Sequence, residues 1–551
     1  MFVLFALAAS IAVAQPDSGL VKRLVLPASP EADRRRLAEL TGDSSMADGL
    51  LQSPSRLLTR DWPRRRVQLQ LIAPEFHLVH NSALPHSLNE GALWAGVGLN
   101  TRTMAGVMLR SGPVTVILAP QRLTEQNLPF QTFTAPGGAG ESRSPLASPF
   151  HLPPGSMDLP QRFGAVERER FDPGQSSITI ASRAVAMGVS TEQQWWGPGV
   201  RNALVLSAQA PGIPHLFVRT NRPWKTRAGA IEAVWQLGQL QESEYFMAKP
   251  RQRPSDGWRS WSAVAASWRP SFEPSLTVGL TRAVYAPWRD RGVRTPFPPS
   301  AIFDAFVPVG RPWRVPGDTL LTTGVRRDQL FSLFGRWVKP AAGFEVWGEW
   351  GRYAEPGSVG ELFTQLHHSH GVTMGAQILR PLGRGASPSM TGTNWRVQLE
   401  LTDLEPSISY RVQPFGEWYA SRAVPQGYTQ QGRVIGAAIG PSGSSQWGAM
   451  DLVGRRWSLG VYGTRIRWEN QAMYTYLREF RRADVSLIGG VRGTIETPAG
   501  RIAVEYASTD RANYLFQARP MPDGTERGID LRNGTLRLTV TLGGGRSISA
   551  R

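Results

Sequence analysis

The chain has 551 residues with no cysteine, 57 glycines and 43 prolines, and its 61 lysines and arginines against 43 aspartates and glutamates give a net charge of +18. The missing cysteines exclude a disulfide scaffold and a cysteine-ligated zinc or iron–sulfur centre. Abundant aromatic residues argue against wholesale disorder. No stretch after the first residues reaches the roughly 18 consecutive apolar residues that a membrane-spanning helix needs.

The first residues have the pattern of a secretory signal. Residues 2–11 are an apolar run, and residues 12–14 form a small-residue cleavage site. The basic residue that normally precedes such a run is missing, so a buried N-terminal strand remains the alternative. We expect residues 1–14 to be a signal peptide that is removed on export.

Residues 15–62 are predicted to form a short helical segment on the periplasmic side. Ser29 suits the N-cap of a helix and Pro30 suits its first position. Gly42 can end this helix, and a second short helix is expected between residues 45 and 60.

From residue 63 to residue 543 the hydrophobic pattern changes to a period of two. Apolar and polar residues alternate within residues 67–71, 276–281, 395–402, 501–506 and 536–542. This alternation is typical of strands with one apolar and one polar face. We count roughly 16 to 20 such segments, separated by turn residues. The pattern predicts one large antiparallel β-structure, followed by a C-terminal tail at residues 544–551.

Alternation alone does not say which face points inward, and a soluble sandwich with a solvated polar face remains the alternative. Three features favour a transmembrane barrel: the export signal, the need to remove exposed strand edges, and the spacing of Trp258 and Trp268. These two residues bracket a segment whose tilted height, roughly 25 Å, matches the lipid-facing band. We therefore predict an all-β fold, a large closed antiparallel transmembrane β-barrel. The positions expected to face its lumen are Glu345, Glu349, Arg396, Glu400, Arg501 and Glu505.

Four stretches are expected to be irregular: residues 134–175, 286–318, 354–366 and 381–392. Long loops in a compact structure are usually functional or disordered. In outer-membrane barrels the long loops face outward and the short turns face the periplasm. These stretches are therefore the expected places for a ligand contact or a lumen plug.

In several stretches of its sequence, the chain resembles the Wzi family of outer-membrane capsule-assembly proteins. The matching stretches are residues 89–120, 192–199 (EQQWWGPG), 229–246, 343–353, 379–385 and 426–446, which begins with QGYT. The resemblance implies a barrel of about 18 strands in the cell outer membrane, with a helical part on the periplasmic side. It also implies a lectin-like role in surface attachment or assembly of capsular or exopolysaccharide. The chain departs from the family in that its last strand, predicted to stop at Leu542, lacks a terminal aromatic residue.

The candidate polysaccharide-binding residues are Gln193, Gln194, Trp195 and Trp196. Exposed indole rings stack on the apolar face of a sugar ring, and glutamine side chains bond hydroxyl groups in both directions. Arg201 would add a contact to a carboxylate. The alternative is that the paired tryptophans pack a turn inside the barrel.

Arginine dominates the positive charge, because only four residues are lysine: Lys22, Lys225, Lys249 and Lys339. Arginine grips carboxylate or phosphate groups with two parallel hydrogen bonds. The expected partners are an acidic capsular or exopolysaccharide, outer-membrane lipid and lipopolysaccharide, with the polysaccharide export machinery as a further candidate. A coding bias toward arginine with a solvated rim is the alternative. We expect a monomer and no nucleic-acid partner.

No catalytic residue, metal site or cofactor is predicted. His368 and His370 would share a strand face beside His367, but a chance cluster or a pH sensor fits them better than a metal site. Glu345 and Glu349 lie roughly 13 Å apart along a strand, which is too far for either glycosidase mechanism. The competing functions are an anion-selective porin or diffusion channel and an outer-membrane enzyme, and we expect no enzymatic activity.

Overall fold

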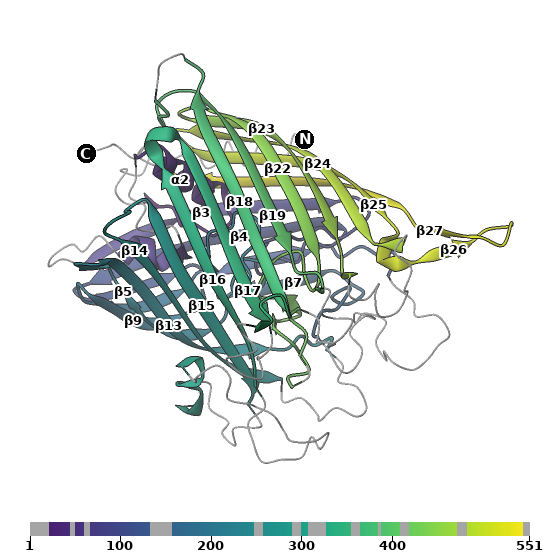
Figure 1. The fold of residues 1–551 in the computed structure, drawn as a ribbon, viewed down its shortest axis with the longest axis horizontal. Coiled ribbons are helices and arrows are strands. Elements are labelled where there is room, and N and C mark those ends of the chain that lie inside the picture. The colour runs from purple at the N-terminus through teal and green to yellow at the C-terminus, as the bar shows by residue number, and fades with distance from the viewer. Residues whose placement is uncertain are drawn as a thin grey trace.

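The fold is a closed antiparallel β-barrel of 18 strands, seen from the side in Figure 1. The computed structural model describes residues 21–43, 50–59, 67–132, 157–246, 257–288, 299–306, 327–353, 364–383, 387–407, 418–421, 423–470 and 482–543. The expected signal peptide, residues 1–14, and the expected tail, residues 544–551, lie outside the described residues. The predicted closed barrel is confirmed.

The barrel wall is a single sheet in which neighbours along the chain are mostly neighbours in space. β4 pairs with both β5 and β6, so these two are parts of one strand path. The last strand, β28, pairs with β3 and closes the barrel. The wall strands are β3 (Gln68–Asn81), β4 (Gly98–Ser111), β5 (Val114–Leu118), β6 (Gln121–Glu125), β7 (Arg168–Asp172), β8 (Ser177–Ala181), β9 (Val185–Ser190), β11 (His215–Thr220), β12 (Trp224–Thr226), β13 (Gly229–Gln241), β14 (Trp258–Pro270), β15 (Leu276–Pro287), β16 (Asp328–Lys339), β17 (Phe344–Tyr353), β18 (His370–Pro381), β19 (Asn394–Asp403), β22 (Ser444–Val453), β23 (Trp457–Arg467), β24 (Val485–Thr497), β25 (Gly500–Ala512) and β28 (Leu531–Leu542).

The remaining elements are short. β1 (Val21–Lys22) pairs in parallel with β3 at Leu71 and Ile72, beyond the part of β3 that β28 covers. The others are α2 (Pro30–Leu40), α3 (Pro54–Thr59), β2 (Leu51–Gln52), β10 (Trp195–Trp196), β20 (Thr429–Gln430), β21 (Arg433–Val434), β26 (Ala518–Pro520), β27 (Glu526–Gly528) and the 3₁₀ turns η4 (Pro299–Ala301), η5 (Asp304–Phe306), η6 (Pro340–Ala342) and η10 (Tyr514–Phe516). Helix α2 begins as predicted, because the Ser29 side chain accepts a hydrogen bond from the backbone of Ala32.

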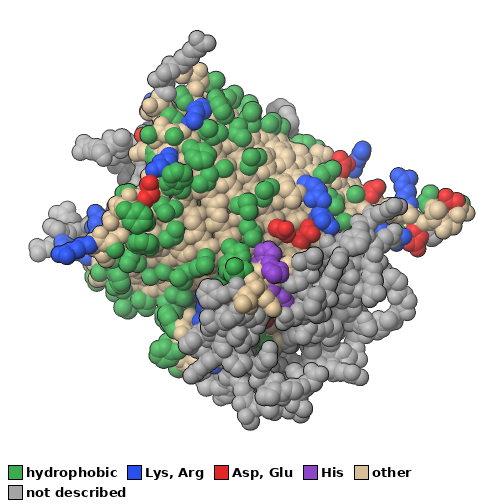
Figure 2. Space-filling model, viewed as in Figure 1, with side chains coloured by type: hydrophobic (Ala, Val, Ile, Leu, Met, Phe, Trp, Pro, Cys, Tyr) green, Lys and Arg blue, Asp and Glu red, His purple; other side chains and the backbone are tan. Residues whose placement is uncertain are grey.

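The apolar side chains of the wall point outward and the polar ones point inward. Figure 2 shows hydrophobic side chains spread over the wall, with charged side chains mostly toward its rims. Exposed apolar residues on the strands include Leu280, Leu333, Met374, Leu399, Leu401, Met450, Leu459, Leu487 and Val504. On the inner side Glu345, Glu349, Arg396 and Glu400 are buried. A polar face buried while the apolar face is exposed is the arrangement of a barrel in lipid.

The protein is therefore an outer-membrane barrel. The connections at one end are short, as between β4 and β5 or between β24 and β25. The connections at the opposite end are long, as between β15 and β16, and in outer-membrane barrels this end faces outward. No helix in the described parts of the chain is long and apolar enough to span a membrane.

Three segments from the end with long connections fold back into the lumen: residues 82–97, residues 191–214, and residues 418–421 with 423–443, called the inner loops from here on. The second and third inner loops share one apolar core with the wall, which includes Leu204 and Tyr428 from the loops and Trp261, Phe334 and Tyr353 from strands. The first inner loop packs Ala92, Leu93 and Ala95 against Val79 and Leu123 of the wall in a separate cluster. The inner loops therefore fill much of the barrel interior.

One sequence expectation needs correction. Residues 134–175 are not irregular throughout, because β7 forms at Arg168–Asp172 and pairs with β6. Within the described part of the predicted helical segment, residues 15–62, helices form at Pro30–Leu40 and Pro54–Thr59. The predicted long stretches 286–318 and 354–366 fall largely outside the described residues, and most of residues 381–392 is described.

Candidate functional site

Helix α2 is docked inside the mouth of the barrel at the end with short connections. Four of its charged side chains form ion pairs with wall strands that lie far apart around the barrel. The helix residue is given first in each pair: Glu39 with Arg336, Arg36 with Glu345, Asp33 with Arg396 and Glu31 with Arg501. Leu37 and Leu40 pack against Val338, Leu379 and Val453 of the wall. The helix therefore closes part of this mouth.

Two wall carboxylates anchor the second inner loop. Glu400 accepts hydrogen bonds of 2.6, 2.9 and 2.9 Å from the backbone nitrogens of residues 200–202. Glu349 accepts one of 3.1 Å from the backbone of Leu204. The first inner loop joins the second through a 2.8 Å bond from Gly91 to Ala208. The lumenal carboxylates thus hold the inner loops in place.

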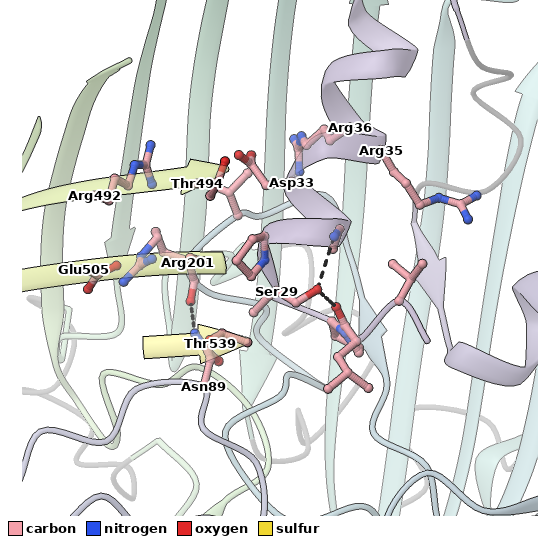
Figure 3. Close-up of a pocket in the computed structure, with 18 of the residues that line it drawn as sticks. Ser29, Asp33, Arg35, Arg36, Asn89, Arg201, Arg492, Thr494, Glu505 and Thr539 are labelled. Carbon is pink, nitrogen blue, oxygen red and sulfur yellow. Dashed lines mark hydrogen bonds between the residues drawn. The ribbon is translucent and has the colours of Figure 1, made fainter. Parts of the chain in front are cut away.

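Between α2 and the inner loops lies a cavity of about 270 Å³, called the inner cavity (Figure 3). Asp33, Arg35 and Arg36 reach it from α2, and Arg492 and Glu505 reach it from the wall. Eight arginines and six carboxylates line it in all: Arg35, Arg36, Arg102, Arg201, Arg336, Arg396, Arg492, Arg537, Asp33, Glu39, Glu75, Glu90, Asp451 and Glu505. The inner cavity is therefore strongly charged, with an excess of positive groups.

The structure divides the predicted polysaccharide-binding residues into two groups. Gln193, Trp195 and Arg201 line the inner cavity. Gln194 instead bonds to His215 at 3.0 Å and accepts a 2.7 Å bond from Gln236.

The expectation of an exposed indole pair at Trp195 and Trp196 is wrong. The two residues are 2% and 1% exposed. Trp196 stacks on Trp261 with ring centroids 6.0 Å apart, and its backbone pairs with Leu51. Trp196 therefore helps to pack an inner loop against the wall, as in the alternative interpretation of the tryptophan pair.

A second cavity, of about 300 Å³, opens at the end with long connections and is called the outer cavity. Three aromatic rings form one side of it: Trp94 and Phe163 lie 5.2 Å apart, and Phe163 meets Tyr245 edge-on at 5.9 Å. The guanidinium of Arg168 lies over the rings of Phe163 and Tyr245 at 5.1 and 5.9 Å. Gln241, Glu242 and Gln431 also line it.

These outer-cavity residues were not predicted as a site from the sequence. Trp94, Phe163 and Tyr245 come from three separate segments, and none belongs to a short motif. The sequence indicated this region only through the expectation that the long outward loops contact a ligand. Only the fold brings the three rings together.

Asp158 ties the segments around the outer cavity together. Its carboxylate accepts two 2.6 Å hydrogen bonds from the backbone nitrogen and the hydroxyl of Ser243. Its backbone nitrogen donates to the carbonyl of Gln426 at 2.8 Å. Burial raises the pKa of Asp158 to about 6.

The raised pKa of Asp158 predicts that the thermal stability of the protein depends on pH. An acid whose folded pKa lies above its unfolded value stabilises the fold most below the unfolded value, here 3.8, and loses that contribution as pH rises through about 6. We expect the thermal-unfolding midpoint of the native protein in detergent to fall between pH 4 and pH 7, and Asp158→Asn to flatten that fall. Parallel pH curves for the two proteins would contradict this.

A control for this experiment is Glu244→Gln. Glu244 lies one residue from Ser243, and its side chain is 70% exposed. The substitution removes a carboxylate from the same segment without touching the buried one. We expect its pH curve to follow that of the native protein.

The histidine cluster lies in the turn before β18, and only His370 belongs to the strand. Its Nδ1 lies 2.6 Å from the carbonyl oxygen of His367. Within the described residues, no group of three or more histidine, aspartate or glutamate side chains is placed to hold a metal ion.

No family model and no curated protein matches the sequence. Among solved structures, the fold is similar to Wzi from Escherichia coli, an outer-membrane, carbohydrate-binding β-barrel involved in group 1 capsule assembly. The likeness has a TM-score of 0.51 and 12% identity and covers 86% of this chain and 85% of that one. OccK2 and OprD of Pseudomonas aeruginosa also match, with TM-scores of 0.39 and 0.38, identities of 9% and 8%, and coverage of 86% of this chain and 96% and 92% of theirs.

Proposed function

We propose that this protein is a Wzi-type barrel that holds an acidic capsular or exopolysaccharide at the cell surface, without catalysing a reaction. The observation that carries the proposal is the outer cavity, where aromatic rings and arginines meet at the outward end of the barrel. The fold shared with Wzi, a carbohydrate-binding barrel, supports it. The filled lumen also supports it, because a surface-binding protein needs no open pore.

The chemistry of the outer cavity suits an acidic sugar. Tyr245 offers both an apolar ring face and a hydroxyl group. Gln241 and Gln431 can donate to and accept from sugar hydroxyls. Arg168 lies 3.0 Å from Glu125 and 3.9 Å from Glu244 and stacks over two aromatic rings, and a sugar carboxylate would bind its remaining N–H groups. Each unit of a polyuronate presents an apolar ring face, hydroxyl groups and a carboxylate, which match these three kinds of protein group.

The direct test is polymer binding by the purified protein in detergent. We expect binding to alginate, a polyuronate, and at least tenfold weaker binding to neutral dextran. Tyr245→Ala should weaken alginate binding at least tenfold, because it removes a ring wall of the outer cavity. A tenfold change corresponds to about 1.4 kcal/mol.

The matched control is Phe272→Ala, which removes an aromatic ring that is 79% exposed. Phe272 lies in the short connection between β14 and β15, at the opposite end of the barrel. We expect this variant to bind alginate as the native protein does. Equal binding by Tyr245→Ala and the native protein would overturn the assignment of the outer cavity.

The second candidate function is an anion-selective diffusion channel. The observation that favours it is the arginine-rich inner cavity within the lumen. Planar-bilayer conductance separates the two functions. A large, steady anion current would favour the channel, whereas a closed barrel is expected if the inner loops and α2 fill the lumen as described.

The proposed partners follow from the same surfaces. The apolar wall contacts outer-membrane lipid, and arginines at the outward rim would meet lipopolysaccharide phosphates. We further propose that the protein is a monomer and that the polysaccharide export machinery delivers the polymer to it.

A further inference from the structure

The inner cavity has a shortage of hydrogen-bond acceptors. Six donor atoms on its lining residues are buried and have no hydrogen-bond partner in the described structure: Arg36 Nε, Arg102 Nε, Gln193 Nε2, Trp195 Nε1, Arg336 Nη2 and Trp447 Nε1. Among the acceptors of the lining residues, Asn89 Oδ1 is buried and has no hydrogen-bond partner in the described structure. Gln193 and Trp195 are 5% and 2% exposed, so solvent reaches neither freely. Buried donors of this kind are normally satisfied by acceptors.

Arg201 adds to this cavity a positive charge that forms no ion pair within the described residues. Six of the other lining arginines form ion pairs: Arg36, Arg102, Arg336, Arg396, Arg492 and Arg537. Arg35 interacts electrostatically with Glu39 and Glu31. Arg201 forms no ion pair with any residue that the structure describes, and its guanidinium lies 5.5 Å from the ring centre of Trp447. Arg492 lies over the same ring at 5.4 Å.

The Arg201 side chain is positioned by its backbone. The Arg201 backbone nitrogen donates to Glu400 at 2.9 Å, and its carbonyl accepts a 2.9 Å bond from Asn89. The guanidinium is therefore held on the cavity wall, where it interacts electrostatically with Glu505 without forming an ion pair. In Figure 3 it lies on the same side of the cavity as Arg492 and Glu505.

From these observations we propose that the inner cavity binds a small hydroxylated anion, with Arg201 holding its carboxylate or phosphate group. The two-pronged guanidinium suits either oxyanion. Gln193 and Trp195 would donate to the ligand, and Asn89 would accept from one of its hydroxyl groups. The volume of about 270 Å³ holds a ligand much larger than water but excludes a polymer chain. This site is separate from the outer cavity and goes beyond polymer retention.

Calorimetric titration of the full-length protein in detergent tests the site with three probes: glucuronate, glucose 6-phosphate and glucose. We expect one of the two anions to bind at least tenfold more tightly than glucose, and the tighter anion identifies the anionic group. Arg201→Gln should weaken anion binding at least tenfold. It keeps the backbone bonds of Arg201, so the inner loop should stay in place.

The matched control is Arg532→Gln, which removes an arginine whose side chain is 90% exposed and lies outside the cavity. Its anion affinity should equal that of the native protein. Anion binding no tighter than glucose binding, or equal anion affinity of Arg201→Gln and the native protein, would overturn the proposal. Alginate binding by Arg201→Gln should be unchanged, so failure of this site and failure of the outer cavity are distinguishable.

Discussion

Leu399→Arg is expected to destabilise the folded barrel by about 2–4 kcal/mol in lipid vesicles, which is the cost of an arginine on the lipid face at mid-bilayer. Leu399 lies at the middle of β19 and is 56% exposed. In a soluble protein, arginine at such an exposed position would change stability by at most about 0.5 kcal/mol. Urea unfolding of the protein folded into vesicles measures the difference.

The control for this experiment is Leu399→Ala, which shortens the same side chain without adding a charge. We expect it to unfold at a urea concentration close to that of the native protein. A Leu399→Arg variant as stable as the Leu399→Ala variant would contradict the lipid-facing assignment of this strand face.

Arg336→Met is the substitution with the second large expected effect. Arg336 is 4% exposed and donates to Glu39 of α2 at 2.5 Å and to Glu345 of β17 at 2.7 Å. Removing one partner of a buried ion pair typically costs about 3–5 kcal/mol, because it leaves an uncompensated charge. The cost falls on the contact between α2 and the wall, so we expect α2 to leave the mouth of the barrel more often.

Limited proteolysis reports this release. Residues 34–36 are three consecutive arginines on α2, and trypsin cleaves after arginine once the helix unfolds or detaches. We expect faster cleavage there in Arg336→Met than in the native protein. Arg532→Met breaks an exposed pair with Asp510, which is worth at most about 1 kcal/mol, and should not change the rate. Equal cleavage of all three proteins would contradict the docking role of Arg336.

The sequence predicted the barrel wall well because strand alternation is local information. In β19 the alternation predicted that Leu399 and Leu401 share one face, and both are exposed apolar residues. Arg396 and Glu400 lie on the other face and are buried. The start of α2 was also predictable, because the N-cap of Ser29 depends on its immediate neighbours.

The contents of the lumen could not be predicted in the same way. Which loops enter the barrel depends on contacts between residues far apart in the chain, such as Glu400 with residues 200–202. The charged residues of α2 gave no sign that their partners would be wall strands. The sequence alone was therefore silent on how α2 and the inner loops meet around the inner cavity.

The tryptophan pair shows the same limit at one site. The residue types of Trp195 and Trp196 suit sugar stacking, but their burial decides what they contact. Trp195 borders the inner cavity, and Trp196 packs on Trp261. The outer cavity, by contrast, draws its rings from residues 94, 163 and 245, a separation that no short motif reveals.

The orientation of the wall is the premise of every site described above, and site-directed spin labelling tests it directly. The chain has no native cysteine, so Leu399→Cys, Leu401→Cys and Gln398→Cys each provide a single labelling position. In lipid vesicles, labels at 399 and 401 should be more accessible to oxygen than to a water-soluble nickel complex, and the label at 398 should not show this preference. Labels at 399 and 401 that are more accessible to the nickel complex would contradict the account.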